Sequence, residues 1–270
     1  MSTYNPGIYE ITNDDYHNSD GLSRSALLEF KRSPLHYWNA YKKEGVREEK
    51  DTAALILGNA VHRYILQPES FNHSYHVCDK PDLRTTKGKE EWVKIQKESF
   101  GKIILPTEVF EEVEKIGQSF LNHELASKFL KDAKIEKSIF WKDSLTGILC
   151  KTRPDIWLPN VIADIKTTAD ASPRSFQRDL IKYGYHIQAA MMQDGIYHIT
   201  GQKIETFVFL CIEKDDPYAI GIYELDKDSI QIGRDEYKLL LEDYRPYEEN
   251  KITDWPSYKP SVISLPAYYY

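Results

Sequence analysis

The sequence predicts an α/β or α+β protein in which a mixed central β-sheet is flanked by helices and preceded by a mainly helical part. The first observation is that apolar residues recur at helical spacing over much of residues 1–133. The second is that strand-like spacing begins near Ile135, and the order strand, strand, strand, helix, strand, strand, helix follows. Since 270 residues can bury a substantial core, we expect one domain over 1–270.

The N-terminal part, residues 1–133, is expected to begin with an irregular lead-in over residues 1–20. Ser23 is placed to cap a helix that carries Leu27 and Phe30 on its apolar side. Ser33-Pro34 ends this helix and starts another. The remaining expectations are a charged mobile loop over 45–51, helices over 52–66, 90–99 and 108–120, and a loop over 79–88.

The predicted β-sheet core covers residues 134–243. Its expected strands are 135–141, 148–158, 161–165, 205–213 and 218–225, and its expected helices are 173–198 and 228–243. Residues 244–270 contain prolines and end in Tyr268-Tyr269-Tyr270, which indicates an extended aromatic tail. This tail either docks on the body of the protein or on a partner, or it is a packed or disordered terminus.

Composition narrows the classes of protein. Charged residues make up 29% of the chain and the net charge is -7, which fits a soluble globular protein and argues against one that coats nucleic acid non-specifically. A local basic groove on an acidic body remains compatible with a nucleic-acid enzyme. The three cysteines lack zinc or disulfide spacing. With no signal peptide and no membrane-length apolar run, we expect a cytoplasmic protein without membrane contact.

Asp155, Asp164 and Lys166 form the chemical centre of the sequence. Acidic residues are depleted in strands, yet one Asp falls in each of two adjacent predicted strands. Asp164 and Lys166 are two apart and therefore point to the same face. If the two strands pair antiparallel, Asp155 joins them, and the carboxylates can hold Mg²⁺ or Mn²⁺ together with the carbonyl of Ile165. The alternative is a structural ion pair near the strand ends.

Lys166 has two possible roles in such a site. It can orient or deprotonate a water molecule, or it can act electrostatically by offsetting charge on a pentacoordinate phosphate. A free lysine has a pKa of about 10.4, so the role of base requires burial or a nearby cation.

These residues carry a resemblance to a known superfamily. Pro154-Asp155 followed by Asp164-Ile165-Lys166 resembles the PD-(D/E)XK nucleases, whose restriction-endonuclease-like core is a mixed sheet flanked by helices. Together with Gly58 and His62 in a helix, Thr167-Thr168 after the lysine and Tyr185-His186-Ile187-Gln188, the pattern is similar to the RecE (exonuclease VIII) branch, near the RecB and lambda exonuclease types. The resemblance spans roughly residues 7–245.

The resemblance implies roles for further residues. His62 becomes a metal ligand or a metal-proximal group, where the alternative is an ordinary helix histidine. Glu136 can serve a second ion or can be an exposed edge-strand charge. Gln188 joins the catalytic residues and Tyr185 contacts the catalytic centre or DNA, although this chain has Met192 where many relatives have Tyr.

Several residues are assigned to DNA or phosphate. Ser23, Arg24 and Ser25 can hold a terminal phosphate at a helix N-terminus, or the serines can simply cap the helix. Ser33 occupies the position where some RecB-like members carry a cluster cysteine, so we expect neither an iron-sulfur cluster nor zinc. The remaining DNA-contacting candidates are Lys151, Arg153, Thr167, Thr168, Arg174, Arg178, Lys182 and Tyr185.

The expected activity is that of a RecE-type exodeoxyribonuclease dependent on Mg²⁺, with Mn²⁺ as a substitute. The resemblance implies 5′ to 3′ degradation of one strand of duplex DNA from its end, release of 5′-mononucleotides and a 3′ overhang. It also implies a ring-like homo-oligomer, a tetramer or trimer, and a RecT-type single-strand annealing partner in bacterial, phage or prophage recombination. The alternatives are an endonuclease or single-strand exonuclease with the same core, or a non-catalytic DNA-binding module.

Overall fold

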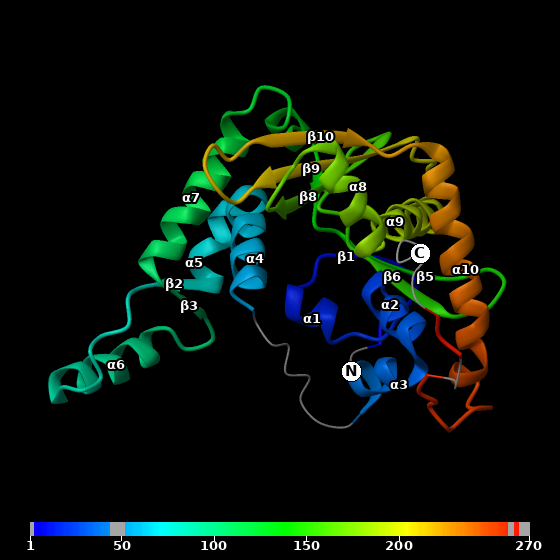
Figure 1. Ribbon diagram of the computed structural model, residues 1–270, viewed down its shortest axis with the longest axis horizontal. Helices are drawn as coiled ribbons and strands as arrows, with labels where there is room; N and C mark the ends of the chain where they lie inside the picture. The colour runs from blue at the N-terminus through cyan, green and yellow to red at the C-terminus, as the bar shows by residue number, and fades with distance from the viewer. Residues whose placement is uncertain (1–2, 44–51, 259–261, 265–270) are drawn as a thin grey trace.

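The computed structural model describes residues 3–43, 52–258 and 262–264, and Figure 1 shows their arrangement. The expected loop over 45–51 and the terminal Tyr268-Tyr269-Tyr270 lie outside the described residues. No helix in the described ranges is both long enough and apolar enough to cross a bilayer.

A mixed five-stranded sheet with the order β10-β9-β8-β7-β4 forms the centre of the fold. Its two longest strands, β8 (Val161–Thr168) and β9 (Thr206–Glu213), run parallel. The antiparallel neighbours are β10 (Ile220–Glu224) beside β9, β7 (Ile156–Trp157) beside β8, and β4 (Lys134–Ile135) beside β7. The predicted α/β class with a mixed central sheet is confirmed.

Two of the predicted strands are divided between sheets. The expected strand 135–141 breaks at Glu136, whose φ of 46° is left-handed, into β4 and β5 (Ser138–Lys142). The expected strand 148–158 breaks at 153–155 into β6 (Leu149–Thr152) and β7, where Pro154 lacks the N–H that a ladder needs. β5 and β6 pair with β1 (Gly7–Tyr9), a strand within the expected irregular lead-in. A separate parallel pair joins β2 (Tyr75–Val77) to β3 (Ile103–Leu105).

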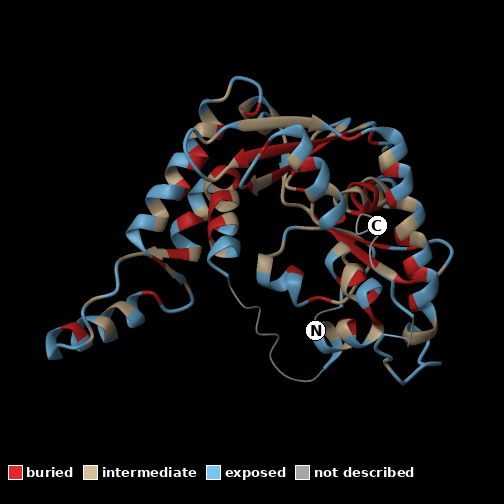
Figure 2. Ribbon diagram, in the orientation of Figure 1, coloured by how far each residue is buried: buried red, intermediate tan, exposed pale blue. Residues whose placement is uncertain are grey.

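Helices cover both faces of the central sheet (Figure 1). On one face, α4 (Ala53–Leu66) and α7 (Thr107–Asn122) pack with the side chains of Ala163 and Ile165. On the other, α9 (Tyr185–Thr200) and α10 (Lys227–Glu248) pack with Ile162 and Phe209. Figure 2 shows β9 and α9 as largely buried, because both lie between other layers.

The remaining helices are shorter. They are α1 (Asn13–His17), α2 (Arg24–Arg32), α3 (Pro34–Tyr37) with a π-helix over Trp38–Lys42, 3₁₀ turns at Pro68–Ser70 and Ser127–Leu130, α5 (Phe71–Ser74), α6 (Thr86–Glu98) and α8 (Pro173–Lys182).

Two predicted boundaries in the second half are wrong. The expected helix over 173–198 is two helices, α8 and α9, because Gly184 adopts a left-handed conformation with φ of 62° between them. α10 continues to Glu248, beyond the predicted end at 243, since Tyr244 is buried against Phe30 and Tyr37 and anchors the extra turns.

The chain after α10 folds back onto the body, one of the expected outcomes for the tail. Trp255 stacks on Tyr247 with ring centroids 4.6 Å apart, and Leu35 N–H donates to the carbonyl of Pro256 at 3.1 Å. We name Phe30, Tyr37, Tyr244, Tyr247 and Trp255 the aromatic cluster, which joins α2 and α3 to α10 and the tail.

Asp143 provides a test of how the β5–β6 hairpin is held against α10. Its side chain is fully buried, accepts N–H groups of Leu145 and Thr146, and forms an ion pair with Lys238 of α10. Burial alone raises the pKa of Asp143, but the hydrogen bonds from Lys238 and Thr146 outweigh it, so the pKa lies below its usual value.

We expect Asp143→Asn to lower the free energy of unfolding by about 1.5–3 kcal/mol at pH 7, because a charge-assisted hydrogen-bond network is lost. A depressed pKa stabilises the fold above the unfolded pKa of about 3.9, and this contribution disappears as the pH falls through the folded-state value. Urea denaturation at several pH values should therefore show that the difference in unfolding free energy between the wild type and Asp143→Asn becomes smaller at low pH. The exposed acid Asp243, changed to Asn, is the control. A difference that does not vary with pH would contradict the account.

Candidate active site

The pairing of β7 with β8 brings two carboxylates together. Ile156 is paired with Ala163 in an antiparallel ladder, so the next residues, Asp155 and Asp164, come opposite each other. The antiparallel pairing, which was the condition for Asp155 to join Asp164 and Lys166, is present. Asp155 Oδ2 also accepts the main-chain N–H of Ile165 at 2.8 Å, which fixes its carboxylate against β8.

Lys166 lies on the same side of β8 as Asp164. Its Nζ is 2.5 Å from Asp164 Oδ2 and 4.6 Å from the centre of the Tyr185 ring. Although this ionic contact is short, Asp164 Oδ2 makes no hydrogen bond of regular geometry, so charge rather than direction holds the pair together. Only 1% of the Asp164 side chain is exposed.

Gln188 supports Asp164 from the first turn of α9. Its Nε2 donates to Asp164 Oδ1 at 2.8 Å, which leaves Asp164 contacted on both oxygens. Gln188 Oε1 is buried and has no hydrogen-bond partner among the described residues. A buried acceptor in this state indicates a position prepared for an incoming donor, such as water or a substrate group.

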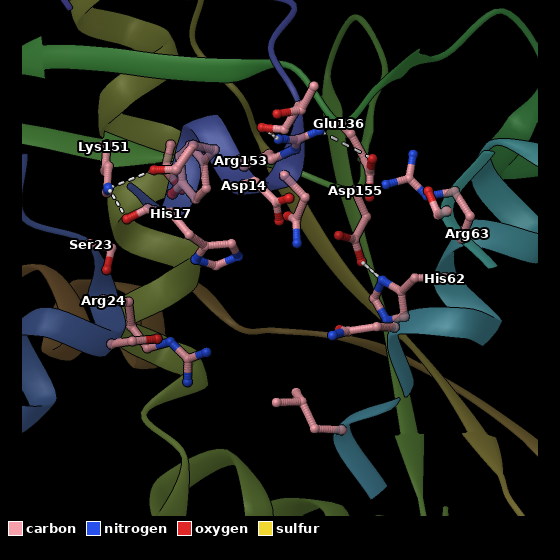
Figure 3. A pocket seen from close by; sticks show the side chains of 18 of the residues that line it. Asp14, His17, Ser23, Arg24, His62, Arg63, Glu136, Lys151, Arg153 and Asp155 are labelled. Atoms are coloured by element: carbon pink, nitrogen blue, oxygen red, sulfur yellow. Dashed lines mark hydrogen bonds and ion pairs between the residues drawn. The ribbon is translucent and has the colours of Figure 1, made fainter. Parts of the chain in front are cut away.

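His62 of α4 reaches the site from the opposite face of the sheet. Its Nδ1 lies 3.4 Å from Asp155 Oδ2, as Figure 3 shows. Gly58, one turn earlier, allows α4 to approach β8 closely: a Cβ at this position would lie 3.3 Å from the Thr167 hydroxyl. The spacing of Gly58 and His62 is thus explained by helix packing as well as by the site.

The charges of the site favour a cation. Burial, and then the neighbouring Asp164, raise the pKa of Asp155 well above its usual range, and His62 and Lys166 offset this only in part. In the described chain, no three His, Cys, Asp or Glu side chains are grouped to hold a metal by themselves. Two carboxylates and the Ile165 carbonyl nevertheless suit Mg²⁺, which commonly takes one or two carboxylates and completes its shell with water and phosphate. The residues present therefore fit a hard divalent ion.

Glu136 lies beside Asp155 but is engaged elsewhere. Its N–H donates to the carbonyl of Asp155 at 3.1 Å, while its carboxylate accepts from Arg153 at 3.3 Å. Arg153 also donates to the carbonyl of Thr12 at 3.2 Å, and its buried Nε has no hydrogen-bond partner in the part of the chain that the structure describes. Glu136 is thus adjacent to the metal-binding candidates, with its charge already balanced by an arginine.

A cleft of 630 Å³ opens at this site, between the N-terminal helices and α4 (Figure 3). Asp155, His62 and Gln188 line it, whereas the buried Asp164 contacts the lining residue Gln188 instead. Further lining residues are Glu136, Arg153, Ser23, Arg24 and Ser25 from the predicted set, and Tyr41, Asn59, Arg63 and His73, which sequence reasoning missed. Asn59 lies one turn before His62, and that helical spacing was the available signal for it.

The three residues predicted to hold a terminal phosphate all line the cleft, but their contacts within the protein differ. Ser23 caps α2 by accepting Ala26 N–H at 3.3 Å. Helix capping was one of the two roles expected for this serine. Arg24 donates to the carbonyl of Tyr183 at 2.5 Å and lies 5.7 Å from the Tyr185 ring. Ser25 is exposed.

Other predicted DNA contacts lie away from the cleft or are engaged internally. Lys151 is buried and donates to the carbonyls of Tyr16 and Ser19, at 2.7 and 2.6 Å, so it holds the N-terminal segment in place. Thr168 is buried and donates to the carbonyl of Asp170 at 3.2 Å. The half-buried Thr167 faces Gly58, and Arg174, Arg178 and Lys182 are exposed on α8.

A mixed sheet with Pro-Asp directly before one strand and Asp-x-Lys within the adjacent strand defines the PD-(D/E)XK class of domain, and both the fold and the site of this chain have this arrangement. The chain belongs to the family described as "PDDEXK-like domain of unknown function (DUF3799)", whose model matches residues 23–258. These findings confirm the predicted PD-(D/E)XK superfamily. They do not distinguish the RecE type from other members of it.

One of two similar solved structures shares the fold. The chain is 17% identical to a candidate exonuclease from Eubacterium rectale, with 90% of this chain and 88% of that chain covered at a TM-score of 0.63. An alkaline exonuclease from Laribacter hongkongensis is 11% identical, with 86% of this chain and 92% of that chain covered at a TM-score of 0.28. The first of these similarities establishes a common fold.

Asp155→Asn should stabilise the protein in metal-free buffer at pH 8, by roughly 1–2 kcal/mol, because one of two neighbouring buried carboxylates is neutralised. The amide oxygen can still accept the N–H of Ile165. Adding Mg²⁺ or Mn²⁺ should raise the melting temperature of the wild type more than that of the variant. Thermal unfolding with and without metal measures both effects, with Asp243→Asn as the control. A variant less stable than the wild type without metal would refute the electrostatic argument.

Proposed function

We propose that this chain is a Mg²⁺-dependent deoxyribonuclease, with Mn²⁺ as a substitute, that degrades one strand of duplex DNA from its end. The observation that carries the proposal is the convergence of Asp155, Asp164 and Lys166 beside a cleft lined by arginines. Membership of a PDDEXK-like family supports the same reaction class. A purely structural ion pair would not need a second carboxylate opposite the first.

The chain's own residues have distinct tasks in hydrolysis. Lewis-acid polarisation of the phosphodiester is what a divalent ion supplies when it is bound to Asp155, Asp164 and the Ile165 carbonyl. Lys166, held between Asp164 and the Tyr185 ring, places a positive charge where negative charge develops on the phosphate. Gln188 orients Asp164 and offers Oε1 as an acceptor for the attacking water.

End dependence is supported by the form of the cleft. A volume of 630 Å³ is within the range of ligand pockets and is sufficient for a short stretch of one strand. Arg24 on its wall can contact the backbone of that strand, and Ser25 can contact a terminal phosphate. We therefore favour an exonuclease over an endonuclease with the same core.

The finer features of the proposal follow the resemblance to RecE-type enzymes. They are 5′ to 3′ polarity, release of 5′-mononucleotides, a 3′ overhang, a ring-like homo-oligomer and a RecT-type annealing partner in bacterial or phage recombination. Strand-specific end labels and light scattering would test polarity and assembly separately from hydrolysis.

Digestion of linear duplex DNA labelled at one end tests the activity. We expect Mg²⁺-dependent release of nucleotides by the wild type and a loss of at least about 100-fold in Asp164→Asn and Lys166→Ala, since both changes remove charge at the reacting phosphate. Asp243→Asn should retain full activity.

Covalently closed circular DNA separates the alternatives. An end-dependent exonuclease leaves it intact, whereas cleavage would identify an endonuclease. Binding of DNA without any hydrolysis would identify a non-catalytic module, and equal activity in Asp164→Asn would disprove the assigned site.

A further inference from the structure

Residues 80–102 form an arm that none of the preceding roles uses. They follow β2 and include α6 and the turn that leads into β3. Figure 1 shows that α6 extends away from the body, beyond the paired strands β2 and β3. Most residues of α6 are exposed, as Figure 2 shows. The arm therefore presents a large part of its surface to solvent.

The charge of the arm is opposite to that of the whole chain. Seven of its residues are Lys or Arg and four are Asp or Glu, so its net charge is +3, whereas the chain has -7. The basic residues are Lys80, Arg84, Lys87, Lys89, Lys94, Lys97 and Lys102. Lys94 is paired with Glu98 at 3.8 Å. Lys87, Lys89 and Lys97 are exposed and form no ion pair with any described residue, so their charges are available to an anionic partner.

The arm is an ordered element. Thr85 caps α6 by accepting the N–H of Gly88 at 2.9 Å. The chain before α6 lies close against the helix, because a Cβ on Gly88 would be 2.1 Å from the carbonyl oxygen of Asp82. One turn further along, the Trp92 ring has the Lys80 ammonium 5.5 Å from its centre. The lysines of α6 are thus carried by a preformed helix, which lowers the entropic cost of binding a partner.

The base of the arm forms part of the cleft wall. Gly101 in the arm and Ile103 directly after it line the cleft that also contains Asp155. At the other end of the arm, Asp79 accepts the N–H of Thr107 at 2.9 Å, which ties the arm to the start of α7. A ligand that leaves the cleft past this wall therefore meets the arm next.

Duplex DNA is the partner that fits this surface. In the proposed function one strand enters the cleft while the DNA behind it is still paired. A duplex carries one negative charge per about 1.7 Å of its axis, and lysines bind its phosphates without reading sequence. A second copy of the chain would need an apolar contact. All residues of the arm are described, and its exposed large apolar side chains are Val93 and Phe100, too few for the core of a protein interface.

We infer that the arm holds the duplex behind the strand end, through contacts of Lys87, Lys89 and Lys97 with its phosphates. The inference rests on the proposed function, since it places the paired DNA outside the cleft in which one strand is hydrolysed. The arm binds DNA in this role and does not touch the reacting atoms. Because the contacts are electrostatic, duplex binding should depend steeply on salt and little on base sequence.

The test measures DNA binding by the full chain in metal-free buffer with a chelator, so that cleavage does not interfere. Fluorescence anisotropy of a labelled linear duplex, several helical turns long, gives the binding constant K at a series of salt concentrations. In the triple variant Lys87→Gln/Lys89→Gln/Lys97→Gln, the slope of log K against log salt should become shallower by about 3, which is about 1 for each lysine. Binding should weaken equally for two duplexes of unrelated sequence.

Two controls restrict the effect to the arm. The variant Lys115→Gln/Lys131→Gln/Lys227→Gln removes the same charge from exposed positions outside the arm and the cleft lining, and it should bind the duplex like the wild type. A single strand of about six nucleotides, within the usual site size of a single-strand groove, probes the cleft without reaching along α6. The wild type and the arm variant should bind this short strand equally.

The outcomes separate this inference from the proposed function. If the wild type digests linear duplex but the arm variant keeps the wild-type salt slope, or the control variant loses as much, the arm does not hold the duplex and the nuclease proposal stands. If light scattering shows a changed oligomeric state in the arm variant, the arm is an interface between copies and the inference is wrong. If the wild type shows the arm-dependent slope but digests no DNA, only the nuclease proposal falls. If it neither binds nor digests duplex DNA, both fall.

Discussion

The antiparallel pairing of β7 with β8 is the constraint on which the candidate site depends. It sets Asp155 opposite Asp164, and the strand period then adds Lys166 on the same face as Asp164. A shift of one residue in this register would turn Asp164 and Lys166 toward α4 and α7, into an apolar layer. Ala163 and Ile165 alternate with the site residues along β8, and their burial therefore fixes the geometry of the candidate site as well as the core.

The two neighbouring carboxylates of the site destabilise the fold locally. Two carboxylates in a buried position repel each other, and the protein compensates with the Lys166 ammonium, the Gln188 amide and the N–H of Ile165. The compensation is incomplete, which is why the pKa of Asp155 lies above its usual range. Incomplete compensation of buried charge is what a binding site for a cation requires before the cation arrives.

Both ends of the chain contribute to the cleft around this site. Lys151 ties the N-terminal segment to β6 through the carbonyls of Tyr16 and Ser19, so α1 becomes one wall. The tail packs through Trp255 on the aromatic cluster, which supports Tyr41 on the wall. Neither contact touches the carboxylates, yet both hold segments that line the cleft beside them.

The sequence by itself indicated the class of fold, the two carboxylates and Lys166, because these follow from local spacing and from an unusual choice of residues in strands, while Gln188 was indicated by the resemblance to a known family. The tertiary structure decided what depends on distant partners. Lys151 looked like a surface cation but is buried by the N-terminal segment, Thr168 is buried at the strand end, and the predicted strand 148–158 is shared between two sheets. Tyr41 enters the cleft only because α3, α10 and the tail meet behind it. Spacing along a chain records which residues share a face, whereas the neighbours of that face come from segments more than a hundred residues away, as Tyr37 and Tyr244 illustrate.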